Sequence, residues 1–326
     1  MNRISLLVLF LTLVFINQAS GQIPIAKKIS EFQKTDFVPT LEHNLLQNRN
    51  AVYCASFLYA WDEIRNTIPS PLRIDSALHD LVLVNNSRSF VNTLNRNEYS
   101  STGAIKGKMI TLSSEFFKSL PFEDPLIGNE HLTFDNTKVS SFGIYGDWSA
   151  DVEILYYKEE SDFIIKLKTK DKEHEIILYM PSTTYSSMAA IIADVARKRE
   201  MGLKEKTNDT TRWKYSLTVY DVIDIPELAF NIDGTYTEIT NNRFNAGAKK
   251  YQISTAKQRV GFFLNEKGAE INTDTTIEIV FAEPVEGEQS KEMIFDKPFF
   301  LMLKRVNNNN PYFGLWVANT ELMVKH

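Results

Sequence analysis

The sequence is poor in the cysteines that stabilise many exported proteins. It contains one cysteine, Cys54, in 326 residues, so no disulfide can form within the chain. An unpaired cysteine acts either as a small buried hydrophobe or as a partner in an intermolecular disulfide. Cys54 follows Ala51, Val52 and Tyr53 in an apolar run. We therefore expect its side chain to be buried.

The motifs of common enzyme classes are also absent from the sequence. It has no Gly-rich phosphate loop and no Gly-x-Ser-x-Gly segment. Asp233-Gly-Thr235 is similar to the triplet of aspartic proteases, but it has no second copy. His174 lies between Glu173 and Glu175 in an expected turn, where we expect a solvated charge cluster. None of the five histidines has zinc-ligand spacing: His43, His79, His131, His174 and His326. We therefore expect no enzyme activity, no bound metal and no cofactor.

Long apolar runs are lacking after the N terminus. Arg3 is followed by a short, mostly apolar run and then by Ala19, Ser20 and Gly21. A basic start, a short apolar core and small residues at the end are typical of a secretory signal peptide, and the run is too short to span a bilayer. We expect a signal peptide over residues 1–21, a single domain over residues 22–326, no membrane span and a secreted protein, extracellular or periplasmic.

A strong excess of charge of one sign is missing too. The formal net charge is −5, which gives no broad electrostatic basis for binding nucleic acid. Hydrophobic residues make up 43% of the chain, enough to build a sizeable core. These values indicate a globular protein without a nucleic-acid partner.

The hydrophobic patterns predict a mixture of helices and strands. Residues 29–47 have an amphipathic helix pattern with Thr40 in the N-cap position. Residues 50–64 predict a short strand followed by a buried helix. Further helices are expected over 74–84 and 185–201, strands over 162–168, 175–181 and 222–232, a solvated connection over 198–214 and a turn over 307–310. The pattern predicts an α+β fold: antiparallel-rich β-sheets with helices grouped at one side.

The stretch over residues 256–299 has the most unusual pattern. A strand over 256–264 is followed by a turn over 265–268, and positions 269–279 then alternate. Their odd-numbered residues are small or β-branched, whereas the even-numbered ones are polar. The acidic segment over 282–292 contains proline and glycine but no hairpin-turn signal. A segment with strand potential beside a long exposed loop can act by adding itself to a sheet.

Three motifs in this part of the chain resemble those of the serpin family. Residues 260–270, Val-Gly-Phe-Phe-Leu-Asn-Glu-Lys-Gly-Ala-Glu, resemble the serpin strand that leads into the reactive-loop hinge. Phe295-Asp-Lys-Pro-Phe299 resembles the Phe-x-x-Pro-Phe that closes that loop, and residues 312–319, Tyr-Phe-Gly-Leu-Trp-Val-Ala-Asn, resemble the final strand. The motifs occur in the serpin order and near the serpin spacing. Residues 108–125 and 222–232 resemble further serpin strands.

The resemblance implies a serpin-like fold with an exposed reactive-centre loop near the C terminus. The hinge residues that it implies are Glu266, Gly268, Ala269 and Glu270. Counting about fifteen residues on from Gly268, as in serpin hinges, places the reactive bond near Ala282–Glu283. The alternative is a bond shifted toward Val285, because the loop is several residues longer than in many serpins. A small residue before that bond indicates an elastase-like target protease.

Two functions are open under this resemblance. The first is suicide inhibition of a serine-type protease, in which cleavage frees the loop and the hinge inserts into the main sheet. The alternative is a non-inhibitory serpin-fold binding or carrier protein. Without the resemblance, the sequence indicates only a generic secreted α+β domain. We expect a monomer in each case.

The sequence departs from the serpin pattern in two places. Cys54-Ala55 stands where serpins have Ser-Pro, in the region that controls opening of the main sheet. Residues 66–107 are much shorter than the matching serpin region. The resemblance therefore predicts that the helix lying across the front of the main sheet, and part of that sheet, are missing.

Overall fold

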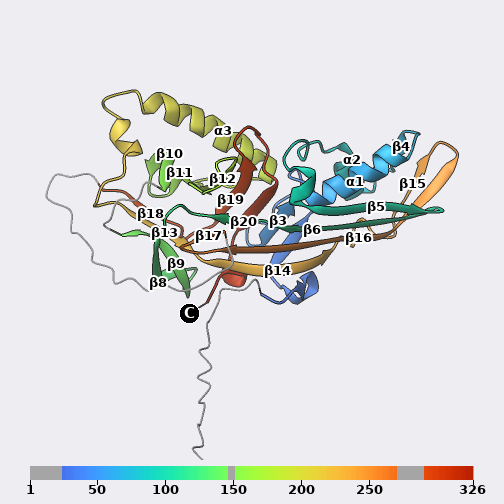
Figure 1. Ribbon diagram of the computed structural model, residues 1–326, viewed down its shortest axis with the longest axis horizontal. Helices are drawn as coiled ribbons and strands as arrows, with labels where there is room; N and C mark the ends of the chain where they lie inside the picture. Colours follow the sequence, from blue (N-terminus) through green and yellow to red (C-terminus); the bar gives the residue numbers. More distant parts are fainter. Residues whose placement is uncertain (1–23, 146–150, 270–289, 326) are drawn as a thin grey trace, which may run out of the picture.

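The computed structural model describes residues 24–145, 151–269 and 290–325. These residues form an α+β fold with two seven-stranded sheets, one four-stranded sheet and a two-stranded ribbon (Figure 1). Most neighbouring strands are antiparallel; the parallel pairs are β1–β14, β13–β18, β16–β6 and β2–β3. The predicted α+β class with antiparallel-rich sheets is confirmed.

The first seven-stranded sheet, which we call the long sheet, is built around β16 (Lys249–Leu264). One edge of β16 carries β14 and, beyond it, the two-residue strand β1; the other edge carries β6 and then β5. At its far end β16 also pairs with β15, which pairs with β4. The bounds are β1 Lys27–Lys28, β4 Leu72–Arg73, β5 Ser100–Lys106, β6 Met109–Phe117, β14 Leu228–Thr235 and β15 Arg243–Ala246.

The second seven-stranded sheet, which we call the central sheet, has the order β10-β11-β12-β19-β20-β3-β2. Every residue of β3, β12 and β20 is buried, because this sheet is covered on both faces. Its strands run over Thr35–Val38 (β2), Asn50–Cys54 (β3), Val152–Glu159 (β10), Asp162–Leu167 (β11), His174–Met180 (β12), Phe299–Arg305 (β19) and Phe313–Val317 (β20).

Two smaller groups of strands complete the described β-structure. The four-stranded sheet has the order β18-β13-β9-β8, with bounds Glu292–Ile294, Val222–Pro226, Thr137–Tyr145 and Ile127–Phe134. The two-stranded ribbon joins β17 (Gly268–Ala269) to β7 (Leu120–Pro121). This ribbon lies where the chain leaves β16 and β6, and the four-stranded sheet includes the strand β18 to which the chain returns.

The α-helices of the described residues lie in two groups on the same side of the long sheet (Figure 1). α1 (Ser56–Thr67) and α2 (His79–Asn86) lie at one end, where α1 packs against β5 and β6. α3 (Met188–Glu205) lies at the other end and packs on β10. None of these helices is long and apolar enough to cross a membrane.

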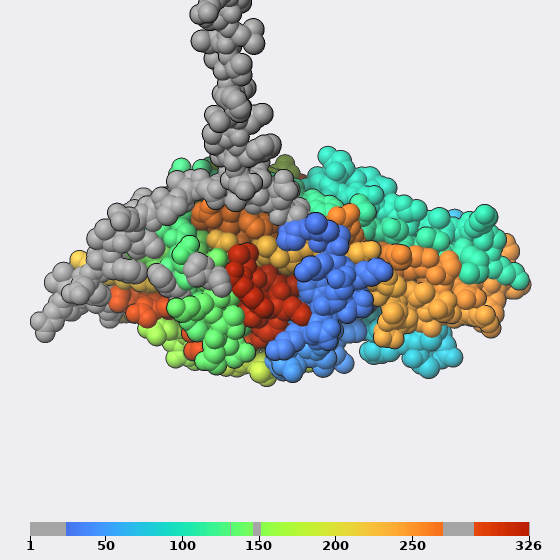
Figure 2. Space-filling view, turned by 90° about the horizontal axis from the view of Figure 1, so that it is seen from below, coloured from blue at the N-terminus to red at the C-terminus, as the bar shows by residue number. Residues whose placement is uncertain are grey.

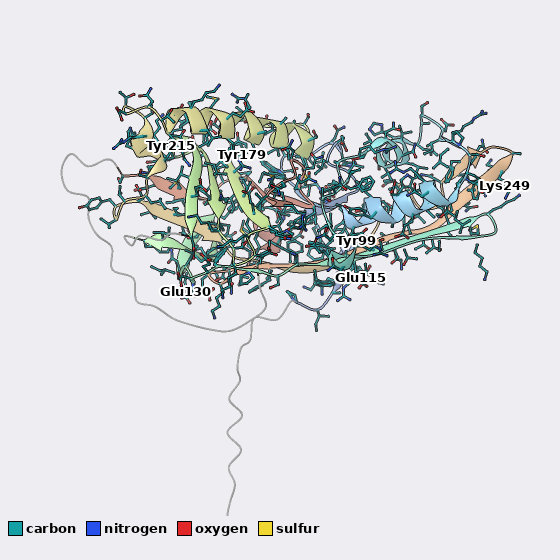
Figure 3. All side chains as sticks on the ribbon, turned by 45° about the horizontal axis from the view of Figure 1, so that its top comes forward. Tyr99, Glu115, Glu130, Tyr179, Tyr215 and Lys249 are labelled. Carbon is teal, nitrogen blue, oxygen red and sulfur yellow. The ribbon has the colours of Figure 1, made fainter. Side chains whose placement is uncertain are left out.

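Helix α3 shows how the local sequence sets its limits and its buried face. The side chain of Ser187 accepts a hydrogen bond from the amide of Ala190, which caps the helix. Met188, Ile191, Val195, Lys198 and Gly202 are buried at alternating spacings of three and four, as an amphipathic helix requires. Tyr179 of β12 lies beneath the helix (Figure 3), and its hydroxyl donates to Asp194 at 2.8 Å.

Aromatic side chains join the long sheet to the central sheet. Phe313 of β20 stacks on Phe262 of β16, with ring centroids 4.7 Å apart, and on Phe116 of β6 at 6.4 Å. Large buried aromatic residues contribute much of the apolar area that drives folding. The two sheets therefore share one hydrophobic core.

The opposite face of β6 is open to solvent. Along β6 every second residue is exposed, and Glu115 lies on this outer face (Figure 3). Ile110, Leu112 and Phe116 point the other way and are buried. No helix in the described parts of the chain lies across this face. Residues 66–107 instead contain the end of α1, then β4, α2, a 3-10 turn over Arg96–Glu98, and β5.

The chain ends pack together on the lower side of the molecule. Figure 2 shows the C-terminal segment in red between the N-terminal segment in blue and the β8–β9 hairpin in green. The carboxylate of Glu321 accepts hydrogen bonds from the amides of Gln33 and Lys34 at 2.6 and 2.9 Å. Ser140 of β9 donates its amide to the carbonyl of Val324 at 3.0 Å.

Four predicted elements differ from the structure. The strand over 222–232 is divided at Glu227 into β13 and β14, which belong to different sheets. The helix over 29–47 was wrong: residues 35–38 form β2, because Pro39 favours extended backbone before it and β2 pairs with β3. The helix over 74–84 begins only at His79, after a turn in which the Asp75 carboxylate accepts from the amide of Ala77. The solvated connection from 198 was also wrong at its start, since Lys198 is a buried residue of α3.

Candidate functional site

The predicted hinge lies at the end of the pair formed by β16 and β6. After Leu264 the chain turns, and Gly268 and Ala269 pair with Pro121 and Leu120 just beyond β6. The carbonyls of Lys267 and Glu266 accept hydrogen bonds from Phe122 and Leu126 at 2.9 and 2.8 Å. The hinge segment is thus held against the chain that follows β6. Three other predicted site residues lie outside the described residues: Glu270, Ala282 and Glu283.

The turn that takes the chain from β16 onto the segment after β6 requires glycine at position 268. Its φ is +110°, a region that side chains disfavour. A Cβ on Gly268 would also lie 2.5 Å from the carbonyl oxygen of Leu120 and 2.8 Å from the amide nitrogen of Phe122. Ala269 follows it with 1% exposure. The hinge sequence therefore combines a residue that permits the turn with one small enough to be buried.

The chain returns from the segment outside the described residues at a buried ion pair. Lys291 lies immediately before β18, and its Nζ is 2.9 Å from Asp221 Oδ2, with both side chains at 1% exposure or less. The Lys291 amide also donates to Asp221 Oδ1 at 2.7 Å, and its ammonium donates to the carbonyl of Ser216. The ring of Trp213 faces the ammonium at 5.5 Å. The return end is therefore firmly anchored.

Between these two ends, β6 and β16 form a parallel ladder. It runs from Met109 opposite Gln252 to Phe117 opposite Gly261. Both strands have antiparallel partners on their outer edges, β5 and β14. Parallel pairing is slightly less stable per residue than antiparallel pairing. Antiparallel pairs in place of this ladder would therefore be slightly more stable per residue.

A chain of buried polar groups joins β6 to β16 beneath this ladder, and we call it the polar bridge. The Gln258 amide of β16 donates to Ser56 Oγ at 2.8 Å and to the carbonyl of Cys54 at 3.0 Å. Ser56 Oγ in turn donates to Ser114 Oγ of β6 at 3.3 Å. The Tyr236 hydroxyl donates to the side-chain oxygen Oε1 of Gln258 at 2.6 Å. Separating β6 from β16 would break one of two hydrogen bonds of Ser56, either the one with Ser114 or the one with Gln258.

The prediction that Cys54 is buried is confirmed. Its side chain lies at the end of β3 with 1% exposure, beside the polar bridge. Burial raises the pKa of the thiol to about 12, and the hydrogen bond with Ser56 offsets only part of this. The thiol is therefore protonated and unreactive in the folded protein.

An acidic side chain with a raised pKa lies near the hinge. Burial raises the pKa of Glu227 to about 7, and the charges of Glu266 and Glu130 add to this. Glu227 links β13 to β14, and its backbone amide and carbonyl bond to Ser140 and Val324. Its carboxyl group is therefore partly protonated at neutral pH.

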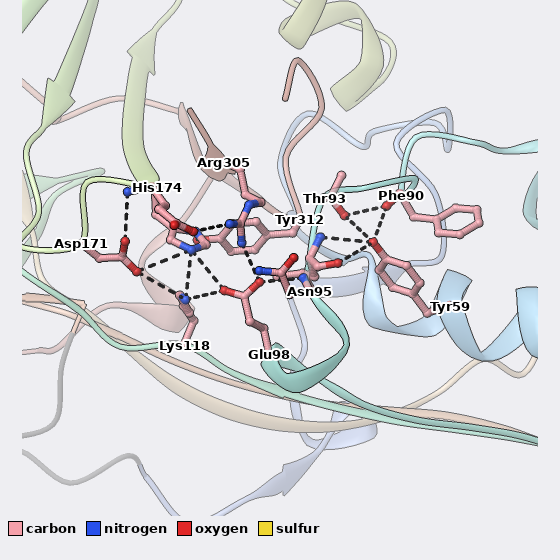
Figure 4. Close-up of polar contacts among 12 residues, drawn as sticks. Tyr59, Phe90, Thr93, Asn95, Glu98, Lys118, Asp171, His174, Arg305 and Tyr312 are labelled. Atoms are coloured by element: carbon pink, nitrogen blue, oxygen red, sulfur yellow. Dashed lines mark hydrogen bonds and ion pairs between the residues drawn. The ribbon is translucent and has the colours of Figure 1, made fainter. Parts of the chain in front are cut away.

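The prediction that His174 belongs to a solvated charge cluster was wrong, because its side chain is only 1% exposed. It lies in the cluster drawn in Figure 4, with Nε2 3.1 Å from Glu98, 3.2 Å from Lys118 and 3.5 Å from Asp171. Nδ1 is 3.1 Å from the Tyr312 hydroxyl. Three of the four partners, Glu98, Lys118 and Tyr312, are distant in the sequence, so sequence spacing gave no signal for this site. No group of His, Cys, Asp and Glu suited to a metal occurs among the described residues.

A groove of about 790 Å³ lies between α3, β19 and the segment after α2. Its lining includes the apolar residues Ile192 and Val195 of α3 and Met302 of β19. Lys304 and Arg199 also line it, and their charged groups lie 3.0 and 3.6 Å from Glu175. The arrangement can enclose a compact ligand with an apolar body. The sequence patterns did not indicate this groove, because its walls come from separate segments.

Comparison with known proteins gives structural matches but no sequence matches. No protein-family model and no curated protein matches the chain. Serpin48, a serpin of the insect Tenebrio molitor, is 14% identical with a TM-score of 0.39, over 64% of this chain and 56% of that one. A serpin from Schistosoma mansoni is 12% identical with a TM-score of 0.39, over 66% and 57%.

A third match is the thermophilic serpin Tengpin in its native state. It is 14% identical with a TM-score of 0.41, over 75% of this chain and 63% of Tengpin. The chain thus spans less than two thirds of the length of each of these proteins. In fold, the protein is similar to these three serpins.

Proposed function

We propose that this protein is a secreted serpin-type inhibitor that acts through cleavage of its loop and insertion of the freed segment into the long sheet. The observation that carries the proposal is the position of the hinge. Gly268 and Ala269 leave β16 and cross onto the chain just beyond β6, at the end of the parallel ladder. A strand continuing from Ala269 can enter between these two strands.

The inserted strand would run antiparallel to both neighbours. It would replace one parallel ladder by two antiparallel ones, and both edges of the new strand would be paired. Residues 269–279 span roughly 36 Å when extended. β16 extends over 16 residues, whereas β6 extends over 9, so the slot between them is roughly 30 Å long. The slot can therefore pair most of the inserted segment on both edges, and the rest of it only along β16.

The side-chain pattern of residues 269–279 fits the two faces of the long sheet. The inner face carries the buried residues Leu112, Ser114 and Val260, so an inserted strand must place small or apolar side chains there. The odd-numbered residues meet this need, beginning with the buried Ala269. The outer face is solvent-exposed on β6 and accepts polar residues.

The proposed chemistry belongs to the target protease. Its nucleophile attacks the carbonyl of Ala282, the bond to Glu283 breaks, and the new amino terminus leaves with a proton. An ester then links Ala282 to the serine of the protease. Insertion of residues 269–279 would carry the linked protease along the sheet before water hydrolyses this bond.

Incubation with a panel of serine proteases tests the proposal. We expect a covalent complex that survives denaturing electrophoresis with an elastase-like enzyme, and a higher melting temperature of the cleaved protein. Cleavage of a loop normally lowers the melting temperature of a protein, so a rise would be diagnostic. A cleaved protein that melts no higher than the intact one would overturn the insertion mechanism.

The groove beside α3 favours a second candidate function, that of a carrier. Its volume of about 790 Å³ suits a compact ligand with an apolar body, and its lining includes Ile192 and Met302. Ala193 lines the same groove, so Ala193→Trp would fill it. We expect the dye 8-anilinonaphthalene sulfonate to bind the native protein and to be lost from this variant. Equal binding by both proteins would exclude the groove as the site.

A further inference from the structure

The cluster around His174 ties the end of β6 to the central sheet. Lys118 is the first residue after β6, whereas His174 begins β12. Lys118 Nζ lies 2.8 Å from Glu98, 3.2 Å from His174 Nε2 and 3.8 Å from Asp171 (Figure 4). Arg305 of β19 holds the other oxygen of Glu98 at 2.8 Å. The contacts therefore connect the first strand of the parallel ladder to the sheet beneath it.

A neutral imidazole suits this cluster in either tautomer. If Nε2 carries the lone pair, it accepts from Lys118 while Nδ1 donates to the Tyr312 hydroxyl. If Nε2 carries the proton, it donates to Glu98 at 3.1 Å while Tyr312 donates to Nδ1. Burial, followed by the charge of Lys118, lowers the pKa of His174 below its ordinary value. The ring is therefore neutral at neutral pH.

A second proton changes the contacts of the ring. The doubly protonated ring has no lone pair, so it cannot accept from Lys118, and two cations then lie 3.2 Å apart. The groups that face the ring from the surrounding elements are Glu98 before β5, Lys118 after β6, Asp171 in the β11–β12 turn, Arg305 of β19 and Tyr312 before β20. Of these, the Lys118 side chain is the cation in direct contact with Nε2, so it is the group that protonation displaces.

We propose that His174 is an acid-sensitive lock between β6 and the central sheet. Its protonation expels Lys118 from the cluster and releases the end of β6. This inference rests on the proposed function, because release of β6 matters where a strand must enter between β6 and β16. The lock acts at the end of the ladder where the hinge residues Gly268 and Ala269 lie.

The test uses a synthetic peptide with the sequence of residues 269–279 and the intact protein. Incorporation of the peptide is followed by native electrophoresis at about pH 5 and about pH 7.5. We expect the wild type to take up the peptide about tenfold faster at the lower pH. His174→Gln, which keeps a neutral hydrogen-bonding side chain, should show equal rates at both pH values. His43→Gln is the matched control and should keep the wild-type response.

If His174→Gln does not fold, Lys118→Met tests the lock instead. This variant lacks the cation that protonation displaces, so it should take up the peptide rapidly at both pH values. Hydrogen exchange of the amides of residues 116–120 and 122 supplies a readout that does not depend on insertion. At the lower pH, exchange should be faster in the wild type than in His174→Gln, since the intrinsic effect of pH is the same in both.

The outcomes separate this proposal from the proposed function. If hydrogen exchange is acid-dependent only in the wild type and the peptide is not taken up, the lock is supported and the insertion mechanism is disproved. Uptake at equal rates at both pH values supports insertion and overturns the lock. Acceleration by acid that persists in His174→Gln also overturns it.

Discussion

The ammonium group of Lys291 lies 2.9 Å from the carboxylate of Asp221, and neither side chain has more than 1% exposure. Removing one partner of such a pair leaves an uncompensated buried charge. We predict that Lys291→Met lowers the free energy of unfolding by about 3–5 kcal/mol, measured by urea denaturation. The exposed Lys297, six residues further on, provides the control variant Lys297→Met. Equal urea midpoints for the two variants would contradict this role.

Cys54 should react very slowly with thiol reagents in the folded protein. With a pKa of about 12, only about one thiol in ten thousand is ionised near pH 8. Labelling with a chromogenic disulfide reagent, with and without urea, measures the difference. We expect slow labelling that becomes rapid when the protein unfolds. Rapid labelling of the native protein would show that the end of β3 opens readily.

Glu227 should make stability depend on pH around neutrality. Its folded pKa of about 7 lies above the ordinary value of 4.5, so the folded state binds the proton more tightly than the unfolded state. This contribution is present below the unfolded pKa and is lost as pH rises through about 7. We predict that Glu227→Gln is more stable than the wild type by about 1–3 kcal/mol at pH 8, and that the difference disappears near pH 4.

Urea denaturation across this pH range measures the effect of Glu227→Gln. The exposed Glu238 gives the control variant Glu238→Gln, which should follow the wild type at every pH. A constant difference between Glu227→Gln and the wild type would mean that the carboxyl group does not titrate in this range.

Ala269→Arg should separate cleavage from insertion. Ala269 is buried at the hinge, so an arginine that enters the sheet there would bring an unpaired charge into the core. The variant should be cleaved as a substrate, release the protease and show no rise in melting temperature. Glu270→Arg is the matched control, because the alternation of residues 269–279 assigns position 270 to the polar face. Trapping of the protease by Ala269→Arg would disprove this assignment of faces.

Elements with strong local patterns could be predicted from the sequence. The helix over 185–201 and the strands over 162–168 and 175–181 correspond to α3, β11 and β12 with small shifts at their ends. Their periodicity is local, so neighbouring residues carry the signal. Residues 29–47 misled the prediction because pairing with β3 overrides a helical pattern interrupted by Pro39.

The polar sites could not be predicted in the same way. The environment of His174 depends on Glu98, Lys118 and Tyr312, which are far apart in the sequence. The polar bridge likewise joins Ser56 to Gln258 across 202 positions. The hinge residues were predicted because their sequence resembles a known motif, whereas the residues that contact Gly268 and Ala269 follow no pattern along the chain.

The open outer face of β6 affects how freely the amino-acid sequence of residues 269–279 can vary under the proposed insertion. A strand inserted between β6 and β16 would contact the core on one side and water on the other. Only alternate positions would then be constrained by packing, and the remaining ones would be free to serve recognition of a partner. Residues 269–279 carry Glu270, Asn272, Asp274 and Glu278 at such unconstrained positions. Under the proposed insertion, the odd-numbered residues of the segment would therefore be selected for packing in the sheet. The even-numbered residues could be selected separately for contact with a partner.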